Sequence, residues 1–267
     1  MKLNEHQILE FTERGILRLE NFIPAALAKQ AKEITLEKLN KFHKNGRWNY
    51  DSVKDLPFPK ANKVFNKQLG SLRPFKSLQT SELLTVIAQL MGEEAIPWMK
   101  FQSLISVPDT SQWEVPSTTW HLDMPAIDNK GLPGIQMFTF LTEVRPGGGG
   151  TLVVAGSHRQ LDELDNFKPK AVRAVLKKEA FFRNLWSKEF PNRLSLMEET
   201  PTNRGGSVQV VEMHGKPGDV YLTDLRILHT VAPNSLDAPR IMLTQRFATK
   251  AMLEATEELK RAYMEKY

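Results

Sequence analysis

From residue 95 onward the chain divides into short apolar or alternating runs, separated by Gly, Pro, Asn and Asp. A period of two is typical of half-buried strands, and the residues between the runs predict turns. Several short strands with this punctuation favour a sandwich or barrel, of which a jelly roll is one form. We therefore predict a mainly β fold with flanking helices around a double-stranded β-helix. The expected strands are 98–107, 117–123, 135–144, 151–155, 207–213, 219–223, 227–232 and 240–248.

The rest of the chain has helical signals. Asn4 is a good N-cap, and Gly15 and Gly92 stand where helices commonly stop. No internal repeat or low-complexity linker divides the chain, so we expect one domain over residues 1–267. Its expected parts are a helical support at about 1–95, a core at about 96–250, a helical insertion at about 159–200 and a C-terminal helix at about 251–266. Within the support we expect helices at 4–14 and 25–41, a strand at 16–19, and a third helix that Ser81 caps and that runs to about Met91.

Composition excludes several classes of protein. Without cysteine the chain has no disulfide, thiolate zinc site or cysteine nucleophile, which fits a reducing, cytoplasmic location. The formal charge of +5 is only mildly basic, and Lys and Arg are scattered among Asp and Glu, so we predict no nucleic-acid partner. No apolar run approaches the roughly 20 residues that span a bilayer, and no secretory signal opens the chain, so we predict no membrane partner either.

His121-Leu122-Asp123 carries the clearest chemical signal. In an extended strand, residues i and i+2 point to the same side, so His121 and Asp123 are expected to face one point while Leu122 turns away. A second imidazole, from His229, would complete a 2-His-1-carboxylate set. Non-haem Fe(II) oxygenases use this set because it leaves coordination positions open. The predicted metal ligands are His121, Asp123 and His229.

Arg240 follows the second histidine and begins an expected strand. The planar guanidinium matches a carboxylate in two-point fashion, as a dicarboxylate co-substrate such as 2-oxoglutarate requires. Arg246 lies on the same face of that strand by period-two geometry, so it is an alternative carboxylate partner. Position after His229 favours Arg240.

Two further features have simpler interpretations. His158 follows a Gly-rich turn, and no nearby carboxylate would complete a metal site with it, so we expect hydrogen bonds that stabilise the loop. The run Gly147–Gly150 lacks the Lys-Ser/Thr and the following helix of a phosphate-binding loop. It leads into an apolar strand instead, so we expect a tight turn between strands.

In several stretches the sequence resembles the phytanoyl-CoA dioxygenase family of Fe(II)/2-oxoglutarate oxygenases. The opening LNEHQILEFTERGILRLENFIPAAL is similar to the family's N-terminal helix–strand–helix, and TTWHLD resembles its first metal segment. RPGGGGTLVVAGSHR resembles its Gly-rich turn. KPGDVYLTDLRILHTVAPNSLDAPRIMLTQRF resembles its second metal segment and arginine strand. The stretches follow the family's order from near residue 3 to residue 247.

This resemblance implies a jelly-roll core, Fe(II) held by His121, Asp123 and His229, and 2-oxoglutarate bound by Arg240. It also makes Gln102 a weaker candidate for contact with 2-oxoglutarate. The expected reaction is oxidation of an unactivated C–H bond with O₂, releasing succinate and CO₂. Because related halogenases carry a small residue in place of the carboxylate, Asp123 favours hydroxylation, with desaturation or cyclisation as variants.

The substrate does not follow from the sequence. Segments 42–78 and 159–205, where the family pattern is weakest, are expected to cover the substrate mouth. An acyl-thioester, an amino acid and a natural-product scaffold all remain open, as does the oligomeric state. Two alternatives also remain: a non-catalytic jelly-roll protein that binds a small molecule, and a cupin-type metal isomerase.

Overall fold

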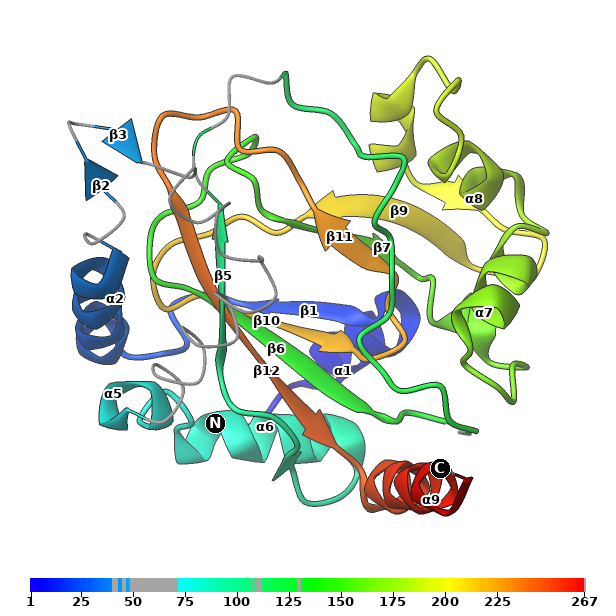
Figure 1. Ribbon diagram of the computed structural model, residues 1–267, viewed down its shortest axis with the longest axis horizontal. Coiled ribbons are helices and arrows are strands. Elements are labelled where there is room, and N and C mark those ends of the chain that lie inside the picture. Colours follow the sequence, from blue (N-terminus) through cyan, green and yellow to red (C-terminus); the bar gives the residue numbers. More distant parts are fainter. Residues whose placement is uncertain are drawn as a thin grey trace.

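Two antiparallel sheets pack face to face at the centre of the protein (Figure 1). The computed structural model describes residues 1–39, 43–44, 47–48, 72–106, 108, 112–128 and 131–266. The larger sheet has the order β1(Ile16–Leu19), β10(Val220–Asp224), β6(Gly134–Phe140), β12(Arg240–Ala248) and β4(Ile96–Pro97), and β5(Gln102–Ser106) also pairs with β12. The smaller sheet has the order β11(His229–Val231), β7(Thr151–Ala155), β9(Ser207–Glu212) and β8(Thr200–Pro201). In a separate two-stranded sheet, β2(His43–Lys44) pairs with β3(Arg47–Trp48) in antiparallel fashion.

Alternation along the strands explains why the larger sheet is buried on both faces. In β12, Ile241 and Leu243 belong to one apolar cluster, whereas Met242 belongs to another. Successive side chains point to opposite faces, so the first cluster lies outside the sheet and the second lies between the sheets. The inner cluster combines Phe138 and Met242 from the larger sheet with Val153 and Ala155 from the smaller sheet. The inner face is therefore the interior of the jelly roll.

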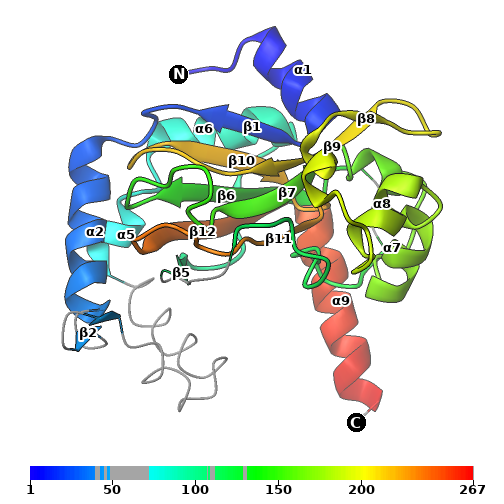
Figure 2. The ribbon, with the colours of Figure 1, turned by 90° about the horizontal axis from the view of Figure 1, so that it is seen from above.

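Helices from the N-terminal third cover the outer face of the larger sheet (Figure 2). The first helix is capped by Asn4, whose side chain accepts from the Gln7 backbone, and it ends at Gly15 with φ of 68°. The left-handed conformation of Gly15 favours glycine, and a Cβ there would meet the His158 ring at 2.5 Å. These helices are α1(Glu5–Arg14), α2(Ala25–Leu39), α5(Arg73–Lys76) and α6(Ser81–Met91).

The insertion after β7 covers the outer face of the smaller sheet. Phe182 and Leu185 of the insertion pack with Leu152 and Val210 of the sheet. This cluster also includes Trp120, so the insertion supports the segment that carries His121 and Asp123. In the figure it lies at the opposite end of the molecule from α2 (Figure 1). The insertion consists of η2(Arg159–Leu161), α7(Pro169–Leu176), α8(Ala180–Leu185) and η3(Arg193–Met197).

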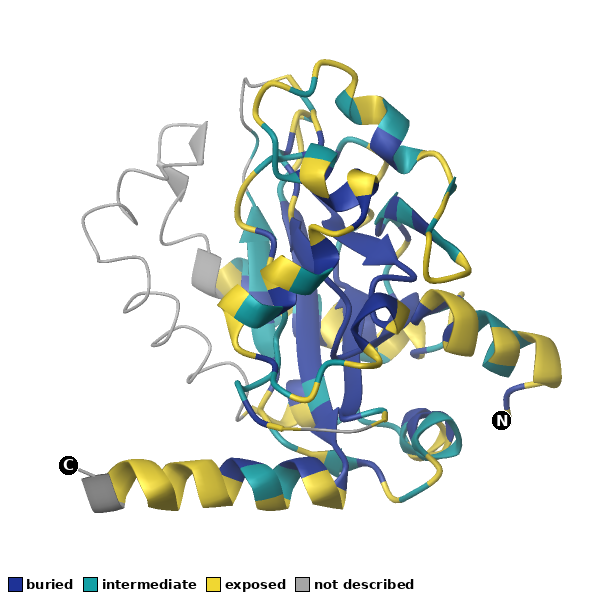
Figure 3. Ribbon diagram, turned by 90° about the vertical axis from the view of Figure 1, so that its right-hand side faces the viewer, coloured by how far each residue is buried: buried dark blue, intermediate teal, exposed yellow. Residues whose placement is uncertain are grey.

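The final helix, α9(Lys250–Lys266), packs only through its first turns. Met252 is buried against Leu225 and Ile127. From residue 257 to residue 264 every side chain is exposed, and the helix extends away from the sheets (Figure 3). No helix among the described residues is long and apolar enough to cross a membrane.

The structure confirms the mainly β class and two facing sheets with flanking helices, and it corrects two details. Residues 117–123 do not form a strand: only His121 pairs, as an isolated bridge, because Thr119 has φ of 65° and breaks the extended conformation. The third helix is capped by Thr80 rather than Ser81, since the Thr80 hydroxyl accepts from the Leu83 backbone. Most of segment 42–78 lies outside the described residues, so its predicted role at the substrate mouth stays a prediction.

Candidate metal centre

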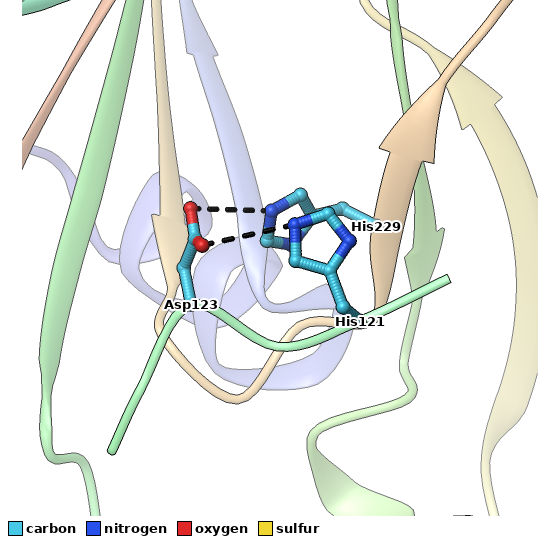
Figure 4. Close-up of side chains that lie close together, drawn as sticks. All are labelled: His121, Asp123 and His229. Atoms are coloured by element: carbon cyan, nitrogen blue, oxygen red, sulfur yellow. Dashed lines mark ion pairs between the residues drawn. The ribbon is translucent and has the colours of Figure 1, made fainter. Parts of the chain in front are cut away.

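Two histidines are joined by their backbones, although 107 residues of sequence separate them. The N–H of each of His121 and His229 donates to the other's carbonyl at 3.0 Å, so the pair exchanges both hydrogen bonds. Such a pair places the two Cα atoms about 5.5 Å apart with side chains on the same side. Their ring centroids lie 4.4 Å apart (Figure 4). Main-chain pairing therefore fixes the spacing of the two imidazoles.

Each ring is oriented through its Nδ1 atom. His121 Nδ1 lies 2.7 Å from the Thr119 carbonyl, and His229 Nδ1 lies 3.1 Å from the Ile227 carbonyl. A carbonyl only accepts, so Nδ1 carries the proton in both neutral rings and Nε2 keeps its lone pair. The positive φ of Thr119 belongs to the same arrangement, and its hydroxyl lies 2.7 Å from that of Thr230. Both Nε2 atoms are thus prepared to bind a metal.

Asp123 completes the group. Its Oδ1 lies 3.7 Å from His121 Nε2, and its Oδ2 lies 3.3 Å from His229 Nε2, as the dashed lines in Figure 4 mark. One donor atom from each residue lies within 4.8 Å of the others. Two imidazole nitrogens and one carboxylate oxygen form the donor set expected for non-haem Fe(II). Among the described residues, this is the one such cluster with three or more metal-binding side chains.

The Asp123 carboxylate is held by two residues of the larger sheet. Gln136 Nε2 donates to Oδ2 at 2.8 Å, and Arg246 Nη2 also bonds to Oδ2. Gln136 and Arg246 are direct partners across β6 and β12, and the Gln136 amide also donates to the Thr244 hydroxyl at 3.0 Å. Gln136 is not among the residues expected from the sequence. The sequence did contain a signal for Gln136, because an amide on the otherwise apolar strand GIQMFTF is expected to be buried and then needs a hydrogen-bond partner.

Charge in the site favours the deprotonated forms. Burial acts to raise the pKa of Asp123, but its contacts with the neighbouring His229 and with the Arg246 guanidinium outweigh burial and hold that pKa well below its ordinary value. Partial burial and the neighbouring His229 ring lower the pKa of His121. Metal ligands must be deprotonated to bind, so both shifts keep these two side chains ready for a cation at neutral pH.

The two arginines of β12 lie in different surroundings. Arg240 is buried, and its Nε donates to the Ser106 hydroxyl at 3.1 Å on β5. Its Nη1 lies 3.5 Å from Met242 Sδ, so the side chain leans along the inner face of the strand. Arg246 is six residues further along, about 20 Å at the usual rise per residue. Arg246 bonds to Asp123 and therefore belongs to the metal end of the site.

Gln102 lies beside Arg246 rather than beside Arg240. Arg246 Nη1 donates to the Gln102 side-chain oxygen at 3.4 Å, and Gln102 pairs with Thr244 across β5 and β12. The predicted contact between Gln102 and a co-substrate stays a prediction. In this structure the residue helps to orient Arg246.

His158 and the glycine run take the structural roles that the sequence predicts. His158 is buried beneath the end of α1, where its Nε2 lies 3.1 Å from the Thr12 carbonyl, and it is not part of the metal cluster. The glycine turn binds a carboxylate of its own chain. Glu212 accepts from the backbone N–H of Gly147 at 2.9 Å and of Gly150 at 3.3 Å. These donors are therefore already engaged, which excludes a phosphate-loop role.

Two facing antiparallel sheets, with two histidines and a carboxylate gathered at one place, define a jelly-roll protein with a candidate metal centre. A family model described as phytanoyl-CoA dioxygenase (PhyH) matches residues 11–242. The chain therefore belongs to the phytanoyl-CoA dioxygenase family, which confirms the resemblance seen in the sequence. A search of curated protein sequences found no significant match.

Solved structures share the fold at low sequence identity. AviO1 from Streptomyces viridochromogenes Tue57 is 17% identical with a TM-score of 0.53, over 92% of this chain and 95% of that one. The carbocyclase SnoK from nogalamycin biosynthesis is 16% identical with a TM-score of 0.54, over 92% and 84%. EctD from S. alaskensis is 16% identical with a TM-score of 0.58, over 93% and 77%. At this identity the similarity establishes the fold alone, and it confirms the predicted jelly roll.

Proposed function

We propose that the protein is an Fe(II)- and 2-oxoglutarate-dependent dioxygenase. One observation carries the proposal: the Nε2 atoms of His121 and His229 and the Asp123 carboxylate converge within 4.8 Å, with both Nδ1 atoms bonded to carbonyls. This donor set fits Fe(II) and leaves positions open for other ligands. Membership of the phytanoyl-CoA dioxygenase family supports the same assignment.

The properties of structural neighbours add support. SnoK is described as non-heme and alpha-ketoglutarate-dependent, and one EctD structure contains 2-oxoglutarate with 5-hydroxyectoine. We infer the same metal and co-substrate here. His121, Asp123 and His229 would hold the iron, and the buried guanidinium of Arg240 would bind the far carboxylate of 2-oxoglutarate.

When bound, iron, 2-oxoglutarate and O₂ supply the power to oxidise an unactivated C–H bond, with release of succinate and CO₂. The chain supplies placement. The Arg246 guanidinium favours the ionised form of Asp123, and the Nδ1 contacts with backbone carbonyls direct the Nε2 atoms of the two imidazoles toward the metal position. The inner apolar cluster around Phe138 and Met242 limits the access of water from the interior of the sheets.

Hydroxylation is the reaction that we propose first, with desaturation or cyclisation as variants. Asp123 occupies the carboxylate position of the triad, so no ligand position is left for a halide in its place. The substrate is a small organic molecule, and acyl-thioesters, amino acids and natural-product scaffolds are the classes to test. Which of the three reactions takes place depends on how one C–H bond of the substrate lies relative to the iron.

The test is a substrate panel that measures succinate formation and O₂ consumption in the presence of Fe(II) and 2-oxoglutarate. We expect substrate-independent turnover in the unmodified protein and its loss in His229→Ala and Asp123→Ala, together with loss of metal binding by calorimetry. Arg240→Ala should raise the 2-oxoglutarate requirement while metal binding remains. Retained succinate release in His229→Ala would refute the ligand assignment.

Two outcomes would favour the alternatives. Tight binding of a small molecule without any turnover would indicate a non-catalytic jelly-roll protein. Turnover that depends on zinc or manganese and needs neither 2-oxoglutarate nor O₂ would indicate a cupin-type isomerase.

A further inference from the structure

The two oxygens of the Asp123 carboxylate have different surroundings. Oδ2 accepts hydrogen bonds from Gln136 Nε2, at 2.8 Å, and from Arg246 Nη2, and it lies 3.3 Å from His229 Nε2. Oδ1 faces His121 Nε2 at 3.7 Å. Each carboxylate oxygen offers about two lone pairs. The two N–H donors therefore engage both lone pairs of Oδ2, and Oδ1 is the oxygen that remains for a metal.

Both donors belong to rigid parts of the fold, whereas Asp123 does not. Asp123 lies in a bend outside the strands. Gln136 and Arg246 are cross-strand partners in the middle of the larger sheet, and the Gln136 amide is fixed further by Thr244, whose hydroxyl donates to the Met137 carbonyl at 2.9 Å. Gln102 contacts the other terminal nitrogen of Arg246 at 3.4 Å. The sheet thus dictates which way the carboxylate of a loop residue is turned.

The number of coordinating oxygens decides how many ligands can be added. An octahedral ion with two imidazoles and one carboxylate oxygen keeps three positions open, whereas a carboxylate that binds through both oxygens leaves two. A co-substrate that chelates through two atoms, followed by O₂, needs all three. A carboxylate that is free to rotate could take the third position.

We propose that Gln136 and Arg246 are positioning residues that hold Asp123 Oδ2 away from the metal, so that Asp123 binds through one oxygen only. This inference rests on the proposed function, because it assumes that the triad binds a divalent metal. It assigns the two arginines of β12 separate roles: Arg240 binds the co-substrate, and Arg246 keeps a position open for it.

The test counts the water molecules on Mn(II) bound to the protein, by the broadening of its electron paramagnetic resonance lines in ¹⁷O-enriched water. We expect three waters in the unmodified protein and two in the double substitution Q136L/R246M, with metal affinity equal or higher. The single substitution R246M serves as a second variant if the double one does not fold. The 2-oxoglutarate requirement should rise in the double variant, and turnover should fall about 10- to 100-fold, the range typical when residues that hold a metal ligand are replaced.

Two control substitutions match these changes. Gln245 lies next to Arg246 on β12, and its buried side-chain amide donates to the Met99 carbonyl at 2.9 Å. The substitution Gln245→Leu removes this amide and should leave three waters on Mn(II). Arg240→Met removes a buried arginine from the same strand and face, and it should also leave three waters while it weakens co-substrate binding. Both controls separate the effect on Asp123 from general damage to β12.

Each contrary result has a distinct meaning. Failure of the unmodified protein to bind Mn(II) would contradict the proposed function itself. If the unmodified protein binds Mn(II) with two waters, or the folded Q136L/R246M or R246M protein keeps three, the metal site stands and the inference is wrong. A loss of metal affinity of about 10-fold or more in these variants would also overturn it, since Gln136 and Arg246 would then be needed for metal binding as such.

Discussion

Removal of the Glu212 carboxylate should destabilise the fold and weaken co-substrate binding together. Glu212 is buried on β9 and accepts from the backbone N–H groups of Gly147 and Gly150. A hydrogen bond to a charged group contributes about 1.5–3 kcal/mol net. Burial raises the pKa of Glu212, so desolvation of the carboxylate offsets part of that gain. We therefore expect Glu212→Ala to lower the free energy of unfolding by about 2–4 kcal/mol and Glu212→Gln, which keeps one acceptor oxygen, by about 1–2 kcal/mol.

The effect should reach Arg240 through the glycine turn. A Cβ on Gly149 would meet the Ser106 hydroxyl at 2.8 Å, and that hydroxyl accepts from Arg240 Nε. Gly149 has φ of 74°, so a turn that loses its anchor can relax away from Ser106. Since small displacements of a binding group are costly, we expect Glu212→Ala to weaken 2-oxoglutarate binding about tenfold with Mn(II) binding unchanged.

Urea denaturation followed by circular dichroism measures the first effect, and calorimetry with 2-oxoglutarate measures the second. Glu179→Gln is the matched control, because Glu179 is also a buried carboxylate that accepts from a loop, at Asn203, but lies outside this turn. Unfolding free energies of Glu212→Ala and the unmodified protein within about 0.5 kcal/mol of each other would refute the reasoning, since that is the range of an ordinary surface substitution.

Three further predictions concern the core. Burial lowers the pKa of His158, so the folded protein loses stability as the pH falls below about 6.5, where the unfolded histidine takes up a proton. The free energy of unfolding should therefore differ less between pH 7 and pH 5 in His158→Gln than in the unmodified protein. Arg226→Met leaves the buried Asp224 without its partner and should cost about 3–5 kcal/mol, and Asp224→Asn in the same protein should restore part of that loss in a double-mutant cycle. Phe182→Ala should cost about 3–5 kcal/mol in thermal or urea unfolding, because the ring is fully buried between Phe181 and Trp186.

Most of the strands could be predicted from the sequence because their signals are local. The run Thr151–Ala155 and the run Arg240–Ala248 have the bounds predicted for them, since turn-forming residues flank both. The segment 117–123 could not be predicted in the same way. Its apolar and polar residues alternate as in a strand, but Thr119 adopts a positive φ that is stabilised by contacts with Thr230, a residue far away in the sequence.

The triad could be proposed from residue types and order, whereas its supports could not. His121, Asp123 and His229 have the chemistry of metal ligands, and the structure brings them together. The contacts of Gln136 and Arg246 depend on which residues face each other across β6 and β12, and that register does not follow from a single sequence. For the same reason the sequence left Arg246 as an alternative to Arg240 for binding the co-substrate carboxylate, and its contact with Asp123 places Arg246 at the metal end of the site instead.

The reciprocal backbone pairing of His121 and His229 has a consequence for engineering. Because the backbone amide and carbonyl groups of these two residues fix their imidazoles, side chains elsewhere around the site can be exchanged without altering the spacing of the two nitrogen ligands. The sequence predicts that segment 42–78 covers the substrate mouth, and on that prediction chimeras that take this segment from another family member should retain metal binding while their substrate preference changes. Substrate preference and metal binding are then separately adjustable properties of one scaffold.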